Sequence, residues 1–316
     1  MSDHPRGLTR DHVVWAYRLL LDRDPESEDV IGPKLAGSRD TRELRHHLMT
    51  SAEFLDKNRD YAHTNDSTVL IKELHGPGSA RLFVDLSDHV IGLSIVRGHY
   101  ETEEIRLVRS WLRIGDCAID AGAHIGFFTM QMAEAVGPTG HVDAFEPFAP
   151  NADLLDRSTA ENRFGDRITL HRAALGASTE TASLTFARET LNSGGAYLLR
   201  PGTAPLAGNA AQTVSVVALD EAPIRRPVRL IKMDVEGAEP QVVAGAARLL
   251  RADRPLLLSE LHPTQLERAS GVSADAFLKQ MTALGYRAHG IENGAVGAPI
   301  ERAPDAIVSA AFVPIA

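Results

Sequence analysis

The residues best suited to chemistry lie in Asp120-Ala-Gly-Ala-His-Ile-Gly126 and in Phe145-Glu-Pro147, and the apolar run Cys117-Ala-Ile119 leads into the first of them. A strand, a glycine turn, a helix and an acidic residue at the end of the next strand form the half-site in which α/β sheets hold an adenosine. Glu146 follows Gly122 by 24 residues (146 minus 122), close to the offset of about 20 at which an acid accepts hydrogen bonds from a ribose. The spacing therefore predicts an adenosine site.

Asp120 distinguishes this turn from a dinucleotide fingerprint. A pyrophosphate site has glycines at its first, third and sixth positions, so that bare backbone can approach the anion. Here the residue two positions before Gly122 is a carboxylate, which repels a pyrophosphate. S-adenosylmethionine, with its ammonium and sulfonium groups, fits that carboxylate better. The structural alternative is that Asp120 caps the helix starting near Ile125 and that Glu146 only ends a strand before a proline.

A second group of charged residues follows two later apolar runs. In an extended chain Lys232, Asp234 and Glu236 share one side, and Glu260 and His262 share a parity in the next run. If the two strands are neighbours, a lysine, three carboxylates and a histidine converge at the ligand crevice. The structural alternative is an ion pair between Lys232 and Asp234, with Glu236 as a helix cap.

The elements that must position these residues alternate between strand and helix. We expect an amphipathic helix over 103–111, and helices between the first three strands of the sheet and between its last two. Such alternation predicts an α/β fold with an open, mostly parallel sheet. The segment 182–218 interrupts it as an inserted hairpin over the site. The strands expected in the sheet are 117–120, 141–146, 168–171, 229–234 and 255–260, with a late strand at 306–313 and earlier short strands at 81–85 and 90–95.

The first sixty or so residues have a different hydrophobic pattern from the rest of the chain. Apolar residues recur there at helical spacing, and Tyr17-Arg-Leu-Leu-Leu-Asp-Arg-Asp-Pro25 with Leu48-Met-Thr-Ser-Ala-Glu-Phe54 resembles a small helical domain of bacterial proteins of surface-polysaccharide assembly. The resemblance suggests protein docking. We expect a helical accessory domain over 1–58, a linker over 59–68, a strand-rich lead-in with a helix over 69–112, and the catalytic domain over 113–316.

The composition of the chain bears on which partners and which cellular compartment are expected. The formal net charge is −9 and no Lys/Arg run alternates with aromatics, so a nucleic-acid partner is not expected. Nowhere do about 18 consecutive apolar residues occur, so no membrane span is expected. The single cysteine, Cys117, has no disulfide partner in the chain, which favours a reducing, cytoplasmic setting of bacterial type.

The motifs together resemble the FkbM family of S-adenosylmethionine-dependent methyltransferases. The resemblance runs from about Gly98 to Pro263, and Lys-Met-Asp-Val-Glu-Gly-Ala-Glu at 232–239 is its most specific piece. It implies a Rossmann-like class I methyltransferase fold and methylation of a hydroxyl on a secondary metabolite, sugar or glycan. The matching segments are Asp120-Ala-Gly-Ala-His-Ile-Gly-Phe-Phe-Thr129, Phe145-Glu-Pro147, Arg172-Ala-Ala-Leu-Gly176, Ile231-Lys-Met-Asp-Val-Glu-Gly-Ala-Glu239 and Leu258-Ser-Glu-Leu-His-Pro263.

The resemblance also implies roles for individual residues. His124 stands where family members commonly have asparagine, and its imidazole can still donate to the cofactor's carboxylate. Tyr100 and Glu101 match a Tyr-Glu pair typical of the family and are expected at a wall of the cofactor or substrate site, and Asn192 lies in the inserted hairpin, whose polar loop is expected at the acceptor. The expected cofactor residues are Asp120, Gly122, Ala123, His124, Gly126, Glu146, Pro147, Ala173 and Ala174.

The expected reaction is in-line attack of an acceptor oxygen on the sulfonium methyl. An alcohol is a poor nucleophile at neutral pH, so a base should assist. His262 has the most suitable unperturbed pKa, whereas Lys232 needs substantial desolvation. A magnesium ion held by Asp234, Glu236 or Glu260 is an alternative. Two other classes stay open at this point: an NAD-dependent oxidoreductase and a non-catalytic adaptor in polysaccharide assembly.

Overall fold

The computed structural model divides the chain into two compact units, residues 1–73 with 84–87 and residues 74–83 with 88–316. The domain boundaries expected from the sequence stay predictions. The residues that the structure describes are 8–49, 51–57, 61–63, 69–74, 76, 78–86, 88, 91–98, 100–187, 193–200, 202–206 and 208–315.

The first unit is mainly helical, and short helices also lead into the second unit. In the first unit α1 contacts the three helices that follow it, and its buried face carries Val13, Tyr17 and Leu21. The elements of this part of the chain are α1 (Arg10–Leu21), α2 (Glu28–Ala36), α3 (Thr41–Met49), α4 (Ala52–Lys57), β1 (Tyr61–His63), β2 (Val69–Glu73), β3 (Arg81–Asp85), α5 (Ile91–Val96) and α6 (Thr102–Trp111).

The strand expected over 90–95 is wrong, because the chain from Ile91 to Val96 forms helix α5. The Oδ1 atom of Asp88 accepts the N–H of Ile91, as a helix-capping carboxylate does. A short apolar run cannot by itself tell a buried strand from a helix turn. The strand expected over 81–85 is confirmed as β3.

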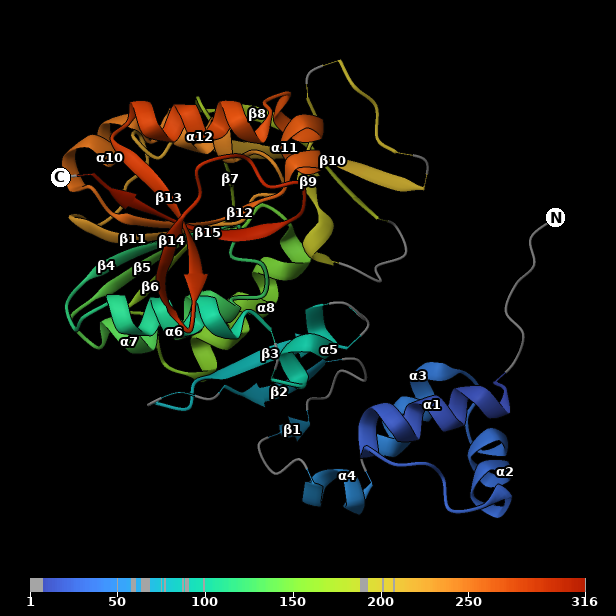
Figure 1. Cartoon of the computed structure of the whole chain (residues 1–316). Helices are drawn as coiled ribbons and strands as arrows, with labels where there is room; N and C mark the ends of the chain where they lie inside the picture. Colours follow the sequence, from blue (N-terminus) through green and yellow to red (C-terminus); the bar gives the residue numbers. More distant parts are fainter. Residues whose placement is uncertain are drawn as a thin grey trace. The chain divides into compact units, whose positions relative to one another are not determined.

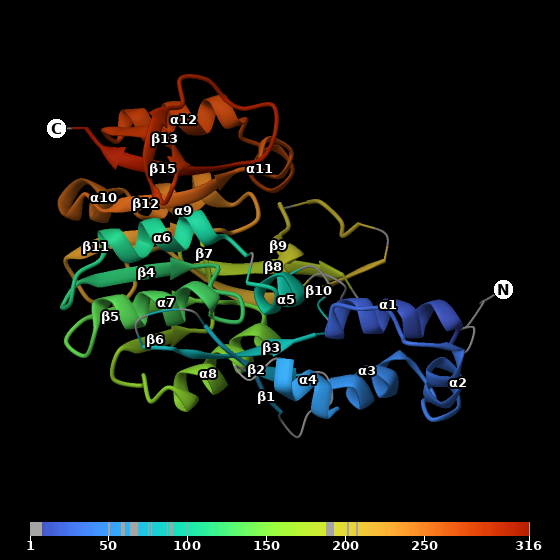
Figure 2. The same cartoon turned by 60° about the horizontal axis from the view of Figure 1, so that its bottom comes forward.

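An eight-stranded sheet forms the centre of the second unit. Its order is β14-β13-β15-β12-β11-β4-β5-β6; the five strands from β12 to β6 are parallel, whereas β15 is antiparallel to both β12 and β13. Figure 2 shows β12, β11, β4, β5 and β6 in succession. The strands are β4 (Cys117–Ala121), β5 (His141–Phe145), β6 (Ile168–His171), β11 (Val228–Met233), β12 (Leu256–Leu261), β13 (Tyr286–Glu292), β14 (Ala295–Pro299) and β15 (Val308–Pro314).

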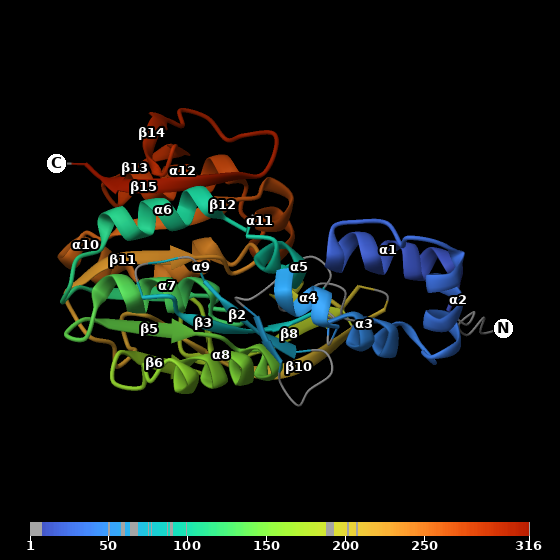
Figure 3. The same ribbon diagram turned by 90° about the horizontal axis from the view of Figure 1, so that it is seen from below.

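Helices cover both faces of this sheet (Figure 1). Helices α6, α7 (Phe127–Val136) and α8 (Ala149–Glu161) lie on one face, as the view from below shows (Figure 3). Helices α10 (Ala247–Asp253) and α12 (Ala274–Ala283) lie on the other, with α9 (Glu239–Gly245) and α11 (Pro263–Ser270) packed against each other. The apolar core between these helices and the strands includes Ile119, Ile231, Phe277 and Phe312, all at most 1% exposed.

The inserted segment forms a smaller sheet of order β7-β10-β8-β9. Strands β8 (Glu180–Ala187) and β10 (Asn209–Val217) are antiparallel, as the sequence predicts, while β10 pairs in parallel with β7 (Ala174–Leu175). The short β9 (Tyr197–Leu198) follows the turn η1 (Ser193–Gly195). Among the residues that the structure describes, no helix is long and apolar enough to cross a membrane.

Candidate active site

The order in which the chain adds parallel strands reverses between β4 and β11, and a pocket opens at this point. From β4 the chain runs outward to β5 and β6, and then returns to the other side of β4 with β11 and β12. Ligands of open α/β sheets bind beyond the carboxyl ends of the strands at such a switch point. The pocket has a volume of about 430 Å³, within the range of small-molecule sites.

One half of this pocket, which we call the cofactor half, is built by the turns after β4 and β5. Gly122 has φ +79, and a Cβ there would lie 1.9 Å from the backbone oxygen of Asp234. The N–H groups of Gly122 and Ala123 both donate to the carbonyl of Phe145, at 3.0 and 2.9 Å. Only glycine fits this turn, because the end of β11 passes directly against it.

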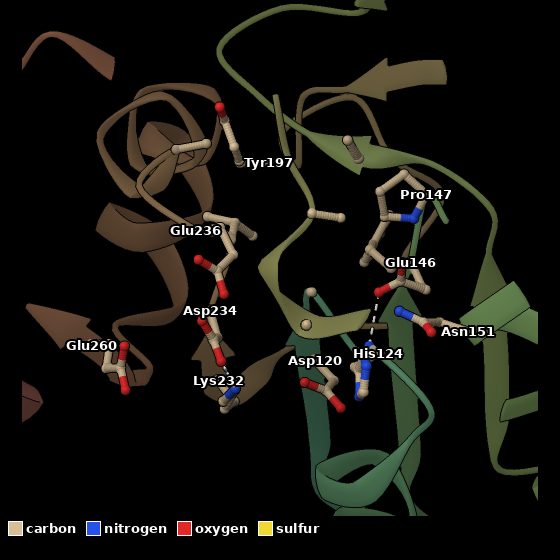
Figure 4. A pocket seen from close by; sticks show the side chains of 18 of the residues that line it. Asp120, His124, Glu146, Pro147, Asn151, Tyr197, Lys232, Asp234, Glu236 and Glu260 are labelled. Atoms are coloured by element: carbon tan, nitrogen blue, oxygen red, sulfur yellow. Dashed lines mark hydrogen bonds and ion pairs between the residues drawn. The ribbon is translucent and has the colours of Figure 1, made fainter. Parts of the chain in front are cut away.

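The carboxylate of Glu146 is fixed by two backbone donors. Its Oε2 accepts the N–H of His124 at 2.8 Å, and its Oε1 accepts the N–H of Phe148 at the same distance (Figure 4). Burial raises the pKa of Glu146 to about 7. Each carboxylate oxygen can accept a further hydrogen bond, so this side chain suits the two hydroxyls of a ribose.

Asp120 supplies a second acceptor in the same half. The hydroxyl of Thr129 donates to its Oδ2 at 2.6 Å, whereas its Oδ1 is buried and has no hydrogen-bond partner among the residues that the structure describes. Burial raises the pKa of this carboxyl. A buried acceptor without a partner costs free energy, and an ammonium group would satisfy it. The residues present therefore fit S-adenosylmethionine, whose amino group is such a donor.

His124 lies next to these carboxylates in a left-handed conformation with φ 52. Burial lowers the pKa of its imidazole to about 4, so the ring is neutral at physiological pH. One ring nitrogen of a neutral imidazole carries a proton and the other accepts. Its donor capacity toward a cofactor carboxylate is thus retained.

The other half, which we call the charged half, begins at the end of β11. Lys232 is the register partner of Asp120 on the neighbouring strand, and its Nζ donates to Oδ2 of Asp234 at 2.9 Å. The same Nζ lies 4.6 Å from the ring centroid of Phe128. Burial alone lowers the pKa of Lys232, but the surrounding carboxylates outweigh it and hold that pKa above its ordinary value. Lys232 is therefore a fixed ammonium and not a proton acceptor.

Two further carboxyls line the charged half. Burial, followed by the charge of Asp234, raises the pKa of Glu236 to about 8 and raises that of Glu260 as well. The side-chain amide of Gln265 donates to Oε2 of Glu236. Figure 4 shows Asp234, Glu236 and Glu260 on one side of the pocket and Glu146, Pro147 and Asn151 on the other. With a pKa of about 8, Glu236 is largely protonated at neutral pH.

His262 lines the same half but already has a structural task. It is the N-cap of α11, and its Nδ1 accepts the backbone N–H of Gln265 at 3.4 Å. Burial lowers the pKa of its imidazole. With Nδ1 as the acceptor, Nε2 carries the proton of the neutral ring. This arrangement makes His262 a hydrogen-bond donor toward the pocket.

Most of the residues predicted from the sequence line this pocket. Gly126 and Ala173 do not: Gly126 precedes α7 and packs on Leu155, and Ala173 is buried beside the pocket wall. Asn192 lies outside the described residues. The predicted residues that line the pocket are Tyr100, Glu101, Asp120, Gly122, Ala123, His124, Glu146, Pro147, Ala174, Lys232, Asp234, Glu236, Glu260 and His262.

Several residues of the site escape sequence reasoning. Gln265 and Asn151 are ordinary helix residues whose positions only the fold brings to the pocket. Thr129 and Glu239 lie inside the family motifs at 120–129 and 231–239, so the sequence did mark them as candidates for the site. In the structure, Oε1 of Glu239 accepts the N–H groups of Val235 and Gly237.

Asp234, Glu236 and Glu260, the expected ligands of an optional magnesium ion, line one pocket. Across the parts of the chain that the structure describes, no group of three or more His, Cys, Asp or Glu side chains is arranged to hold a metal ion.

Residues 120–288 match the family model described as the methyltransferase FkbM domain. This match covers more than half of the 316 residues, and the chain belongs to this family. With the antiparallel β15 between β12 and β13, the second unit has the Rossmann-like class I methyltransferase fold. Family membership makes the protein a methyltransferase, a class that uses S-adenosylmethionine, and replaces the oxidoreductase alternative.

The chain is similar to several solved methyltransferase structures at low sequence identity. A methyltransferase FkbM from Methylobacillus flagellatus KT is 16% identical, with a TM-score of 0.42; the match covers 95% of this chain and spans 58% of that one. A SAM-dependent O-methyltransferase from Thermotoga maritima is 15% identical, with 82% and 86% covered and a TM-score of 0.41. TYW2 of M. jannaschii, solved with AdoMet, is 11% identical, with 80% and 90% covered and a TM-score of 0.39. No curated protein matches the sequence.

Proposed function

We propose that this protein transfers a methyl group from S-adenosylmethionine to a hydroxyl oxygen of a secondary metabolite, sugar or glycan. The observation that carries the proposal is the single pocket at the switch point, which joins an adenosine-type half-site to a charged half. When bound, the cofactor supplies an electrophilic methyl group on a sulfonium. The protein then has to orient an acceptor oxygen in line with that methyl group and remove a proton.

The two halves divide these tasks. In the cofactor half Glu146 would hold the ribose, and the free Oδ1 of Asp120 would accept from the ammonium. In the charged half the ammonium of Lys232, fixed by Asp234, would donate to the acceptor oxygen and so orient it. The carboxyl groups of Glu236 and Glu260 suit the neighbouring hydroxyls of a sugar, since a carboxyl oxygen accepts hydrogen bonds and a protonated carboxyl also donates one. None of these steps is assigned to a metal ion, and a magnesium ion held by Asp234, Glu236 or Glu260 stays the alternative.

A thermal-shift titration with S-adenosylhomocysteine, NAD and buffer tests the cofactor part of the proposal. A ligand that binds only the folded state raises the melting temperature by mass action, so we expect a shift with S-adenosylhomocysteine alone. The variant Asp120→Asn keeps the side-chain shape and should bind it at least about tenfold more weakly, because a charged hydrogen bond contributes roughly 1.5–3 kcal/mol. No shift for the wild type at millimolar S-adenosylhomocysteine would contradict the proposal.

The acceptor class requires a methyl-transfer screen. Wild-type protein is incubated with S-adenosylmethionine and a panel of neutral sugars, oligosaccharides and polyhydroxylated metabolites, and S-adenosylhomocysteine formation is measured with and without a chelator. We expect turnover with a hydroxylated acceptor and a methyl ether in the product. Product methylated on nitrogen or carbon would refute O-methylation, and loss of turnover with the chelator would refute the metal-free assignment.

We add two proposals, one on the location of the protein in the cell and one on a partner of its helical unit. We place the protein in the cytoplasm, supported by its single free cysteine, Cys117, whose thiol pKa is raised by burial. We also propose that the helical unit docks to a partner protein, supported by the exposure of Trp15 and Leu19, one helical turn apart on α1. Cell fractionation tests the first, and co-purification with and without residues 1–58 tests the second.

A further inference from the structure

Glu101 has no role in the methyl transfer proposed above, although its carboxyl lines the pocket. It lines the main pocket and also a second, smaller void of about 20 Å³, which Phe128, Lys232 and Glu260 border as well. Glu104, which lies in the first turn of the helix that Glu101 precedes, borders only the smaller void. Glu101 is therefore placed on the wall between the pocket and the interior.

The backbone of Glu101 is held in an unfavourable conformation. Its φ and ψ are 43° and 45°, in the left-handed region, and it occupies the N-cap of α6 without making a side-chain cap hydrogen bond. Residues other than glycine pay a conformational cost in this region. The backbone carbonyl of Glu101 accepts the N–H of Ile105 at 3.0 Å, so Glu101 begins α6 through its backbone, whereas its side chain lines the pocket.

Three other candidate proton acceptors of the pocket already have hydrogen-bond partners. Lys232 is an ammonium bound to Asp234, and Nδ1 of His262 accepts the N–H of Gln265. Glu236 is held by the amide of the same glutamine. Glu260 lies on the far side of the Lys232–Asp234 pair from Asp120 in Figure 4, away from the cofactor half.

The groups that face Glu101 keep it able to change protonation. Burial raises the pKa of Glu101 to about 7, while the charge of Lys232 opposes that rise and the Tyr100 hydroxyl donates to the carboxylate. A base whose pKa lies near the working pH is the most effective. The other acids around this carboxyl and its Tyr100 partner are Asp234 at the end of β11, Glu104 on α6 and Glu260 on β12.

We propose that Glu101 is the general base of the methyl transfer, an assignment that rests on the proposed function. As the acceptor oxygen forms its bond to the methyl carbon, the carbon–sulfur bond breaks and its electron pair stays on sulfur. The hydroxyl proton passes to the carboxylate of Glu101. The products are a methyl ether, neutral S-adenosylhomocysteine and a protonated Glu101, which returns its proton to solvent.

The first test needs no acceptor. Sinefungin resembles S-adenosylmethionine but carries an amine-bearing carbon in place of the methyl-bearing sulfur, so it places a positive charge where the methyl group is transferred. We measure the affinities of sinefungin and S-adenosylhomocysteine for wild type, Glu101→Gln and Glu104→Gln by calorimetry between pH 6 and 8.5. The wild type should prefer sinefungin, increasingly so as Glu101 ionises through pH 7.

In Glu101→Gln this preference should fall about tenfold and lose its pH dependence, with S-adenosylhomocysteine affinity within about threefold of wild type. Glu104→Gln, one turn along α6, should behave as wild type. Equal loss of the preference in both variants, or none in Glu101→Gln, would overturn the proposal. Absence of any binding to the wild type would instead refute the proposed function itself.

A second variant separates chemistry from folding. Glu101→Gly relieves the left-handed backbone, so its melting temperature should equal or exceed that of wild type while the sinefungin preference is lost. With an acceptor identified in the screen, Glu101→Gln should lower kcat by about 10²- to 10⁴-fold and remove the acidic limb of the pH–rate profile. A Glu260→Gln variant that alone loses that limb would transfer the role to Glu260 and refute Glu101.

Discussion

The two halves of the pocket are built by different means. In the cofactor half, backbone hydrogen bonds fix the geometry. The N–H groups of Gly122, Ala123, His124 and Phe148 donate to acceptors within two adjacent turns. In the charged half, side chains from β11, β12 and α6 meet, and few cations balance their carboxyls. The first half depends on shape and the second on electrostatics, so substitutions should affect them differently.

The largest effect is expected from Gly122→Ala, which tests the dependence of the cofactor half on shape. A Cβ there would lie 1.9 Å from the backbone oxygen of Asp234, so β4 and β11 must separate at a cost of about 4 kcal/mol or more. Gly202→Ala is the matched control, since Gly202 has the same φ of +79 with nothing within 4 Å, and should cost about 1 kcal/mol. Chemical denaturation measures both, and similar costs would refute the steric account.

Lys232→Met tests the dependence of the charged half on its one buried ammonium. Removing it leaves Asp234 and Asp120 without a cation, and breaking a buried pair costs about 3 kcal/mol. The exposed pair of Arg172 with Asp153 provides the control, because Arg172→Ala should cost under about 1 kcal/mol. If denaturation shows Lys232→Met to be as stable as wild type, the pair of Lys232 with Asp234 does not stabilise the fold.

Glu146→Ala should act on affinity more than on folding. It removes the acceptor of two backbone N–H groups and, under the proposed function, of the ribose. A charged hydrogen bond contributes roughly 1.5–3 kcal/mol, so S-adenosylhomocysteine should bind about 30-fold more weakly. Glu146→Gln retains one acceptor oxygen and should bind with intermediate affinity. Calorimetry that places the glutamine variant below the alanine variant would contradict this role.

The smallest effect concerns Glu239, which supports the loop of the charged half. Burial raises its pKa to about 7, above the unfolded value of about 4.3, so the folded state binds the extra proton. Stability is then greatest at low pH and falls as pH rises through 7. From pH 5.5 to 8.5 the wild type should lose roughly 1–2 kcal/mol more than Glu239→Gln; parallel stability curves for the two proteins would exclude the shift.

Local patterns in the sequence were sufficient for the strands that carry the site. The runs ending at Asp120, Glu146 and Asp234 were placed correctly because alternation and glycine turns are local signals. Strands β13 and β14 are not among the strands expected from the sequence, because β13 pairs with the distant β15 and a short window does not contain that contact. The expected strand over 90–95 is wrong for another reason: the capping carboxylate of Asp88, three residues before Ile91, is a local helix signal that the apolar run obscures.

The sequence by itself determined the α/β class and the family, and it predicts the residues of the cofactor half, because one turn and one acid at a fixed offset already specify that half. Only the tertiary structure decided what the charged residues can do. The protonation of Lys232, Glu101 and Glu236 depends on burial and on carboxyls that approach from other strands, and His262 is a helix cap because α11 begins beside it. Electrostatic energy depends on distance and desolvation in the fold, and neither is written in residue spacing.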